Sequence, residues 1–150
     1  MALISAAVAA TLALCAPFHD EASGLYGYHD CNGAIAVEAK YFLAQEFSEG
    51  GIAAVVDEEG WLYIDRKGNS VIRPMVYDNG PDYFSEGLAR YIEDGRYGYF
   101  DENGRVVLRA QYEFALPFEN GSARVGHDCS FDTVGEHSEV DCKRWTTITR

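Results

Sequence analysis

The chain has 150 residues, of which 47% are hydrophobic and 13% aromatic, and this composition excludes an intrinsically disordered protein and fits one domain with its own core. Its formal charge is −12, from 24 acidic and 12 basic residues, and no more than two Lys or Arg residues stand together. Nucleic acids and anionic membrane surfaces require a concentrated basic face, so neither is expected as a partner.

The N-terminal segment 1–19 contains no Asp, Glu, Lys or Arg, and most of its residues are Ala, Leu, Val or Ile. This pattern is typical of the apolar part of a secretory signal peptide and predicts export to the periplasm or the medium. The apolar run before Pro17 is shorter than the roughly 20 residues that span a bilayer, so no integral membrane domain is expected after signal removal. The alternative is a buried N-terminal helix in a cytoplasmic protein.

Three blocks of similar sequence follow at intervals of 35 and 36 residues, and they begin at Tyr26, Trp61 and Tyr97. Each block opens with five alternating residues, YGYHD, WLYID or YGYFD, and such alternation predicts a half-buried strand. An Asp-x-x-Gly sequence comes next, in which Asp accepts a backbone hydrogen bond and Gly adopts a positive φ, so a hairpin turn is expected. The turns end at Gly33, Gly68 and Gly104.

A return strand is expected after each turn, at 34–37, 70–73 and 105–109. A looped connector then carries one tyrosine (Tyr41, Tyr77, Tyr112) and an F-x-x-G motif, which reads FSEG at 47–50, FSEG at 84–87 and FENG at 118–121. A third strand starts directly after the motif. Because Asp-Gly between alternating strands favours a two-residue hairpin, the step at Asp94-Gly95 predicts that neighbouring units are linked by β-hairpins.

The repeats lie near 24–59, 60–94 and 95–128, and a partial fourth copy at 143–150 opens with WTTIT. A period of this size indicates stacked supersecondary units that cover one another's apolar faces. The sequence therefore predicts one all-β domain over 24–150, made of tandem repeats of about 36 residues, each a three-stranded β unit.

This pattern resembles the WG repeat, also called the KWG repeat, a bacterial module in which an aromatic-Gly-Tyr-Ile-Asp strand, a turn glycine, a connector tyrosine and an F-x-E-G step recur. The resemblance covers residues 24–126 and 145–149. It implies a β-rich repeat array with a binding or structural role, and it supplies no catalytic residues. No copy contains the Trp-Gly pair itself, because the positions hold Tyr26-Gly27, Trp61-Leu62, Tyr97-Gly98 and Trp145-Thr146.

Cys129 and Cys142 bracket an insertion in the last linking hairpin. If that hairpin forms, its two strands bring these residues side by side, so an oxidising compartment would favour a disulfide between them. A metal site that adds His127 and His137 is the alternative, but its spacing matches no standard zinc pattern. Cys31 would be left unpaired in its turn, since Cys15 would leave with the signal peptide.

The acidic groups Asp57-Glu58-Glu59 and Glu93-Asp94 lie in expected linking turns. Acids in such turns are ordinarily solvated, whereas a hydrolase needs two carboxylates at a defined separation in a cleft. A small hydrolase with paired carboxylates is therefore kept only as a minor alternative.

Recurring aromatic residues are the stronger candidates for function, and Trp61, Tyr97 and Trp145 are the possible ligand-stacking residues. Aromatic rings can stack on sugars or hold a quaternary ammonium, which makes a carbohydrate- or choline-binding envelope protein the main alternative. Repeats also need an apolar stripe to pack against their neighbours, and core packing explains most of these rings.

No catalytic residue, cofactor site or metal site is expected, since phosphate-binding glycine motifs and nucleophile elbows are absent from the sequence. The sequence predicts a non-catalytic binding or scaffolding module of an exported bacterial protein, with a protein or a cell-envelope glycan as partner.

Overall fold

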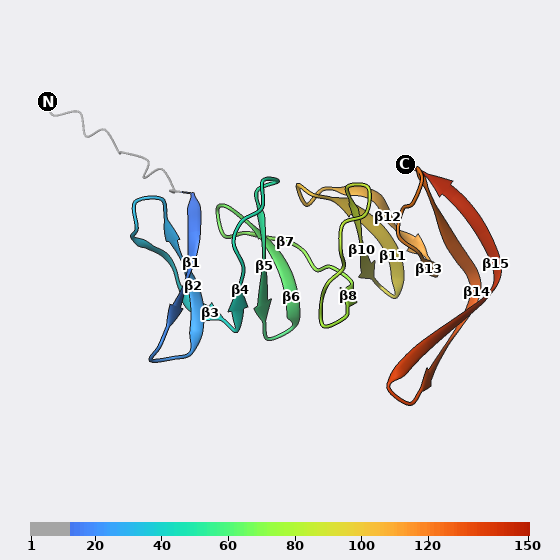
Figure 1. Ribbon diagram of the computed structural model, residues 1–150, viewed down its shortest axis with the longest axis horizontal. Coiled ribbons are helices and arrows are strands. Elements are labelled where there is room, and N and C mark those ends of the chain that lie inside the picture. The colour runs from blue at the N-terminus through green and yellow to red at the C-terminus, as the bar shows by residue number, and fades with distance from the viewer. Residues whose placement is uncertain (1–12) are drawn as a thin grey trace, which may run out of the picture.

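A computed structural model describes residues 13–150, and this part of the chain contains strands and turns but no helix. Figure 1 shows small sheets set side by side in a row, in chain order along the longest axis. The predicted all-β tandem architecture is confirmed.

The second, third and fourth of the larger sheets each join the last strand of one repeat to the first strand of the next. The first sheet contains β1 (Leu14–Asp20), β2 (Leu25–Asp30) and β3 (Ile35–Tyr41). The second contains β4 (Leu43–Ala44), β5 (Ile52–Asp57), β6 (Gly60–Asp65) and β7 (Ser70–Ile72). The third contains β10 (Leu88–Glu93), β11 (Arg96–Asp101) and β12 (Val106–Tyr112). The fourth contains β13 (Phe114–Ala115), β14 (Ser122–Val134) and β15 (His137–Thr149), and the short pair β8 (Val76–Tyr77) and β9 (Gly80–Pro81) forms a separate hairpin.

The linking hairpins form where the sequence predicts them. Glu93 lies opposite Arg96 in the β10–β11 ladder, and the two residues between them, Asp94 and Gly95, have φ values of 50° and 75°. Positive φ at both central residues is the type I′ geometry that matches the twist of the flanking strands. The insertion near the C-terminus lengthens the last linking hairpin, in which β14 and β15 pair up to Val134 opposite His137.

The first sheet begins earlier than the sequence indicates. Strand β1 pairs antiparallel with β2, with His19 opposite Tyr26, and so takes the place that β5 and β10 hold in the next sheets. The alternative of an N-terminal helix is therefore wrong for Leu14–Asp20. Residues 1–12 of the predicted signal segment 1–19 lie outside the described residues, and removal of the segment up to residue 19 would delete most of β1.

The three Asp-x-x-Gly turns have the same geometry. In each turn the Asp carboxylate accepts hydrogen bonds from the backbone N–H groups two and four residues later, at 2.8–3.1 Å. The turn glycines have φ values of 82–85°. These local contacts explain why the motif recurs, since Asp and Gly are the residues that this reversal requires. The residues are Asp30 and Gly33, Asp65 and Gly68, and Asp101 and Gly104.

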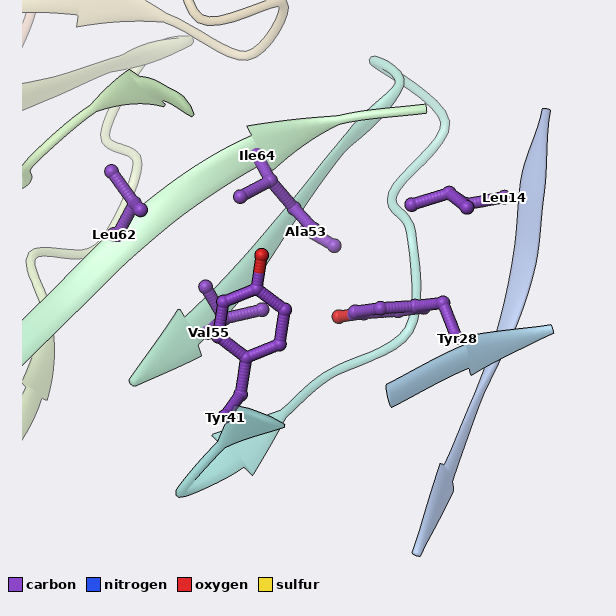
Figure 2. Close-up of a cluster of buried hydrophobic side chains, with 7 residues drawn as sticks. All are labelled: Leu14, Tyr28, Tyr41, Ala53, Val55, Leu62 and Ile64. Carbon is purple, nitrogen blue, oxygen red and sulfur yellow. The ribbon is translucent and has the colours of Figure 1, made fainter. Parts of the chain in front are cut away.

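The hydrophobic core lies between neighbouring sheets. One cluster joins the first two sheets, and Figure 2 shows Tyr28 and Tyr41 facing Val55 and Ile64 across the interface. A second cluster around Tyr99 joins the third and fourth sheets. Each unit thus buries its apolar face against the next one, as expected for stacked repeats.

An aromatic contact recurs inside every repeat and ties the connector to the first strand. The ring centroids lie 5.4 Å apart for Tyr28 and Phe47, 6.3 Å for Tyr63 and Phe84, and 4.9 Å for Tyr99 and Phe118. The phenylalanine of F-x-x-G therefore has a packing role. The first copy differs by one residue, because the positive φ that Gly87 and Gly121 adopt at the end of the motif falls on Gly51 and not on Gly50.

Candidate functional site

The predicted ligand-stacking residues do not form one row. Tyr97 from β11 and Trp145 from β15 both contact Phe114 of β13, with ring centroids 5.3 Å and 6.0 Å away. Phe131 of β14 approaches the same ring at 6.4 Å. We call Tyr97, Phe114, Phe131 and Trp145 the aromatic patch. Trp61 on β6 is not part of it.

The members of the patch also have structural contacts. Tyr97 packs against the core cluster around Tyr99, and the guanidinium of Arg124 lies 4.9 Å from the centroid of the Trp145 ring. Phe131 is 56% exposed, whereas Tyr97, Phe114 and Trp145 are half-buried. Phe131 therefore offers the most accessible ring of the patch.

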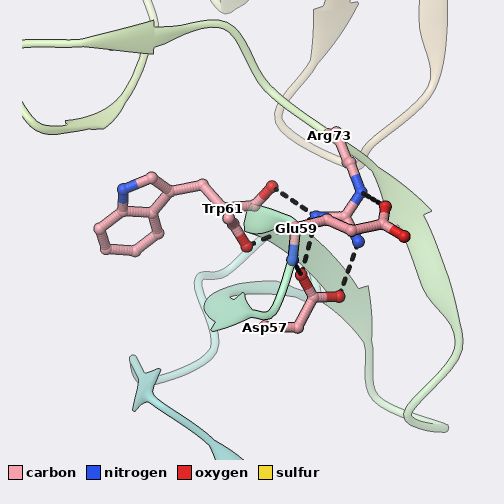
Figure 3. A network of polar contacts seen from close by, with 5 residues as sticks. Asp57, Glu59, Trp61 and Arg73 are labelled. Atoms are coloured by element: carbon pink, nitrogen blue, oxygen red, sulfur yellow. Dashed lines mark hydrogen bonds and ion pairs between the residues drawn. The ribbon is translucent and has the colours of Figure 1, made fainter.

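The acidic group in the second linking turn is held by one arginine, as Figure 3 shows. Arg73 donates two hydrogen bonds to the Asp57 carboxylate, at 3.0 and 2.6 Å, and its Nε lies 3.3 Å from Glu59. The hydrogen bonds from Arg73 lower the pKa of Asp57 below its ordinary value, against the opposing effect of desolvation. These two carboxylates thus bind a side chain of the protein, and the Trp61 ring points away from them (Figure 3).

A buried ion pair in the second repeat was not predicted. Arg90 of β10 donates to both carboxylate oxygens of Asp82, at 2.9 and 2.8 Å, and to the backbone carbonyl of Ala115 at 3.0 Å. Burial alone would lower the pKa of Arg90, but the hydrogen bonds and charge of Asp82 raise it above its ordinary value. The pair connects the β8–β9 region to the third connector. No local pattern signals it, because its residues lie on different elements.

The four cysteines lie in two pairs. Cys129 and Cys142 stand opposite each other in the β14–β15 ladder, with their sulfur atoms at disulfide distance. Cys15 and Cys31 form a second such pair, which sequence reasoning missed because it assigned Cys15 to a removed segment. His127, a member of the alternative metal site, has its Nε2 atom 2.9 Å from the Thr146 hydroxyl oxygen. Within residues 13–150 no cluster of three or more potential ligands could hold a metal ion.

A cavity of about 590 Å³ lies beside Tyr63. Its wall combines the first connector, strands β5 and β6, Phe84 and the Asp-x-x-Gly turn of the third repeat. The polar lining residues come from the first connector and this turn, and they include Gln45, Glu46, Ser48, Glu49, Glu102 and Asn103. Sequence reasoning did not find this site, because its residues are more than 50 positions apart.

The cavity occupies a place where the connectors do not meet. Between the second and third connectors, Ser85 donates from its hydroxyl to the carbonyl of Phe118 at 2.6 Å, and Glu86 accepts from the N–H of Gly121 at 2.9 Å. The equivalent serine of the first connector, Ser48, donates instead to Ile52 at 3.1 Å, within its own repeat. The cavity lies at this place and is lined by the first connector and by Phe84 of the second.

Tyr63 itself departs from the other two copies. The hydroxyl of Tyr28 donates to the carbonyl of Gln45 at 2.8 Å, and that of Tyr99 donates to the carbonyl of Leu116 at 2.6 Å. Among the described residues, the Tyr63 hydroxyl has no hydrogen-bond partner, and Tyr63 lines the cavity. Burial raises the pKa of this phenol, so it stays protonated and neutral at physiological pH.

Comparison with protein families decides the identity of the repeat. Residues 63–97 and 97–128 each match the family described as WG containing repeat. This chain carries WG repeats. Both matched WG repeats start on the first strand of a predicted block, at Tyr63 and Tyr97, which confirms the resemblance for the second and third blocks.

The glycine of the WG repeat has a physical role in the first and third copies. A Cβ atom added at Gly98 would lie 2.7 Å from the carbonyl oxygen of Leu108, and one at Gly27 would overlap the carbonyl of Val37. In the second copy β7 ends at Ile72, so no return strand lies opposite Leu62, and a buried side chain fits. The WG glycine is therefore required only where the return strand crosses it.

A search of curated proteins and a search of solved structures found no match. Among the residues that the structure describes, no helix is long and apolar enough to span a membrane.

Proposed function

We propose that the chain is a non-catalytic binding or scaffolding module of an exported bacterial protein, with a protein or a cell-envelope glycan as partner. The observation that carries this proposal is the aromatic patch, in which three rings of the fourth sheet and Tyr97 of the third sheet come together. Aromatic rings on a rigid support provide contact area at low entropic cost. The patch therefore supplies a surface suited to recognition.

The arrangement of the carboxylates favours binding over catalysis. Asp57 and Glu59 contact Arg73, and the recurring turn aspartates accept backbone hydrogen bonds. A hydrolase with paired carboxylates would need two of them free to act on one substrate. These contacts support a structural role for the carboxylates on which a hydrolase function would depend.

Export is supported by the two cysteine pairs, since disulfides persist mainly in oxidising compartments. Because β1 and Cys15 belong to the first sheet, we propose that any cleaved leader ends before Leu14. The intact mass of the exported protein, measured with and without reductant, tests both points. Retention of residues 14–20 and loss of four hydrogens relative to the reduced protein are the expected results.

An envelope glycan, or a choline group attached to one, is the more specific form of this proposal. Trp145 belongs to the patch and Trp61 does not, so Trp61→Phe leaves a single tryptophan that reports on it. Soluble cell-wall glycan fragments and choline should then change the fluorescence of Trp145. If neither ligand changes the fluorescence of Trp145, the glycan form of the proposal is wrong and a protein is the remaining partner.

Two exposed phenylalanines allow a matched test of the patch. Phe131 lies in the patch and is 56% exposed, whereas Phe42 lies outside it and is 57% exposed. Binding to a glycan, or to a protein recovered with the wild-type chain, should weaken with Phe131→Ala and not with Phe42→Ala. Equal effects of the two substitutions, or turnover of the bound glycan, would contradict the proposal.

A further inference from the structure

We propose that the cavity beside Tyr63 binds a primary ammonium group on an alkyl chain, as found in a free diamine or in a lysine side chain. The cavity shares no residue with the aromatic patch. The two proposed binding sites can therefore fail independently.

The charge of the cavity favours a cation. Three carboxylates line it, those of Glu46, Glu49 and Glu102, and the lining contains no Lys or Arg. None of the three makes an ion pair within the part of the chain that the structure describes. All three residues are exposed, and a cation bound in the cavity would supply a counter-charge to them, more strongly in a partly enclosed site than in bulk water.

The aromatic wall is suited to the apolar part of the ligand. The rings of Tyr63 and Phe84 lie 6.3 Å apart and tilted by 55°, and both pack against fully buried Phe100, at 5.8 and 5.5 Å. These contacts hold the wall in place before any ligand arrives. Methylene groups can pack against such rings, and an ammonium is attracted to their faces.

The polar groups favour a primary over a quaternary ammonium. A primary ammonium carries three N–H donors, which the carboxylates of the lining can accept, and Tyr63, whose hydroxyl has no partner among the described residues, also lines the cavity. A quaternary ammonium has no N–H group to donate to them. A neutral sugar would leave all three carboxylates without a counter-charge.

The cavity is part of the folded stack and not a gap at its edge. Gly50 of the first repeat lies directly against the backbone carbonyl of Glu102 in the third repeat, where a Cβ atom would overlap it. This contact fixes the distance between the two acidic segments of the wall. The volume of about 590 Å³ falls within the range of small-molecule sites.

NMR titration of the full chain tests this proposal. The probes are cadaverine as the free diamine, Nα-acetyl-lysinamide as the lysine side chain, and 1-pentanol as a neutral control of similar length. We expect the ammonium compounds to shift the amide signals of Gly50, Ile52 and Asn103, with weaker binding at high salt. We expect no such shift with 1-pentanol. Tighter binding of cadaverine would identify a free polyamine as ligand, and tighter binding of the blocked lysine would identify a peptide.

Matched double substitutions test the role of the carboxylates. Glu49→Gln with Glu102→Gln should weaken ammonium binding by about tenfold, since two exposed charge contacts are lost. Glu136→Gln with Glu139→Gln makes the same change of net charge in the distant β14–β15 hairpin and should leave binding unchanged. Tyr63→Phe removes only the hydroxyl and should weaken binding by about two- to threefold.

The proposal is overturned if 1-pentanol shifts the same amides as strongly as cadaverine, because the site would then be apolar. It is also overturned if both double variants weaken binding equally, or if no ammonium probe shifts these amides at millimolar concentration. Amide signals that match the wild-type spectrum confirm that each variant remains folded.

Discussion

The second repeat differs from the first and third, although all three share the same turns and strand order. The turn glycine and the connector phenylalanine are 16 residues apart in the second repeat and 14 apart in the other two. The longer connector folds into the β8–β9 hairpin, and Tyr77 on it is 55% exposed, whereas Tyr41 of the first repeat is 5% exposed. Two added residues thus change the environment of a recurring position.

Further differences of the second repeat occur together with this insertion. The return strand β7 ends early, and the position of the WG glycine holds Leu62. The Tyr63 hydroxyl lacks the carbonyl partner that Tyr28 and Tyr99 have, and the cavity opens beside it. The flanking repeats thus share the contact between tyrosine and carbonyl, whereas in the second repeat the tyrosine lines a cavity instead.

The largest expected effect concerns the ion pair of the second repeat. Arg90→Leu leaves the carboxylate of Asp82, which is 2% exposed, without its counter-charge, and should lower the free energy of unfolding by about 3–5 kcal/mol. Arg73→Leu breaks a partly exposed pair and should cost about 1 kcal/mol or less. Urea denaturation measures both, and equal losses would show that Arg90 does not hold the inserted hairpin in place.

The WG glycine gives the next largest difference between repeats. Gly98→Ala places a methyl group against the return strand of the third repeat and should destabilise the protein by about 2–3 kcal/mol. Leu62→Met changes the equivalent position of the second repeat, where a side chain already fits, and should cost less than about 1 kcal/mol. Thermal unfolding of the two variants compares them directly. A tolerated Gly98→Ala would contradict the role that we assign to the WG glycine.

Removal of the tyrosine hydroxyl should affect the stability differently in the different repeats. Tyr99→Phe leaves the carbonyl of Leu116 without its donor and should cost about 1–2 kcal/mol, and Tyr28→Phe should behave alike. Tyr63→Phe removes a hydroxyl without a partner and should change the stability by less than about 0.5 kcal/mol. Urea denaturation measures the loss of stability in each variant. A larger loss for Tyr63→Phe than for Tyr99→Phe and Tyr28→Phe would contradict this assignment.

The smallest expected effect is a pH dependence at Asp57. Since Arg73 lowers the pKa of this carboxyl in the folded state, the stabilisation is complete above the unfolded value of about 4 and is lost as the pH falls through the folded value. At pH 6 the Arg73→Gln variant should therefore have a lower free energy of unfolding than the wild type, by up to about 1 kcal/mol. This difference should disappear near pH 2. A gap that widens on acidification would contradict this assignment.

Features encoded by neighbouring residues could be predicted from the sequence. The Asp-x-x-Gly turns and the Asp94-Gly95 hairpin follow from local backbone preferences, and the period of about 36 residues predicts the stack. The placement of Cys129 opposite Cys142 follows from the hairpin register.

Features that depend on distant contacts could not be predicted. The start of β1 continues the apolar N-terminal run, but Leu14 belongs to the core and Cys15 lies beside Cys31, contacts that the local sequence does not encode. The pair of Arg90 and Asp82 has no sequence signature. The cavity has no sequence signature either, because its lining combines the first connector, Tyr63, Phe84 and the turn of the third repeat, which meet only when the repeats are stacked.

The exchange rates of the tyrosine hydroxyl protons, measured by NMR, test most directly whether the flanking repeats are equivalent and the second has diverged. Hydrogen bonds to backbone carbonyls should slow exchange at Tyr28 and Tyr99, so both hydroxyl protons should be observable, whereas the Tyr63 proton should exchange rapidly with water in the cavity. A slowly exchanging hydroxyl at Tyr63, or rapid exchange at both other tyrosines, would contradict this account.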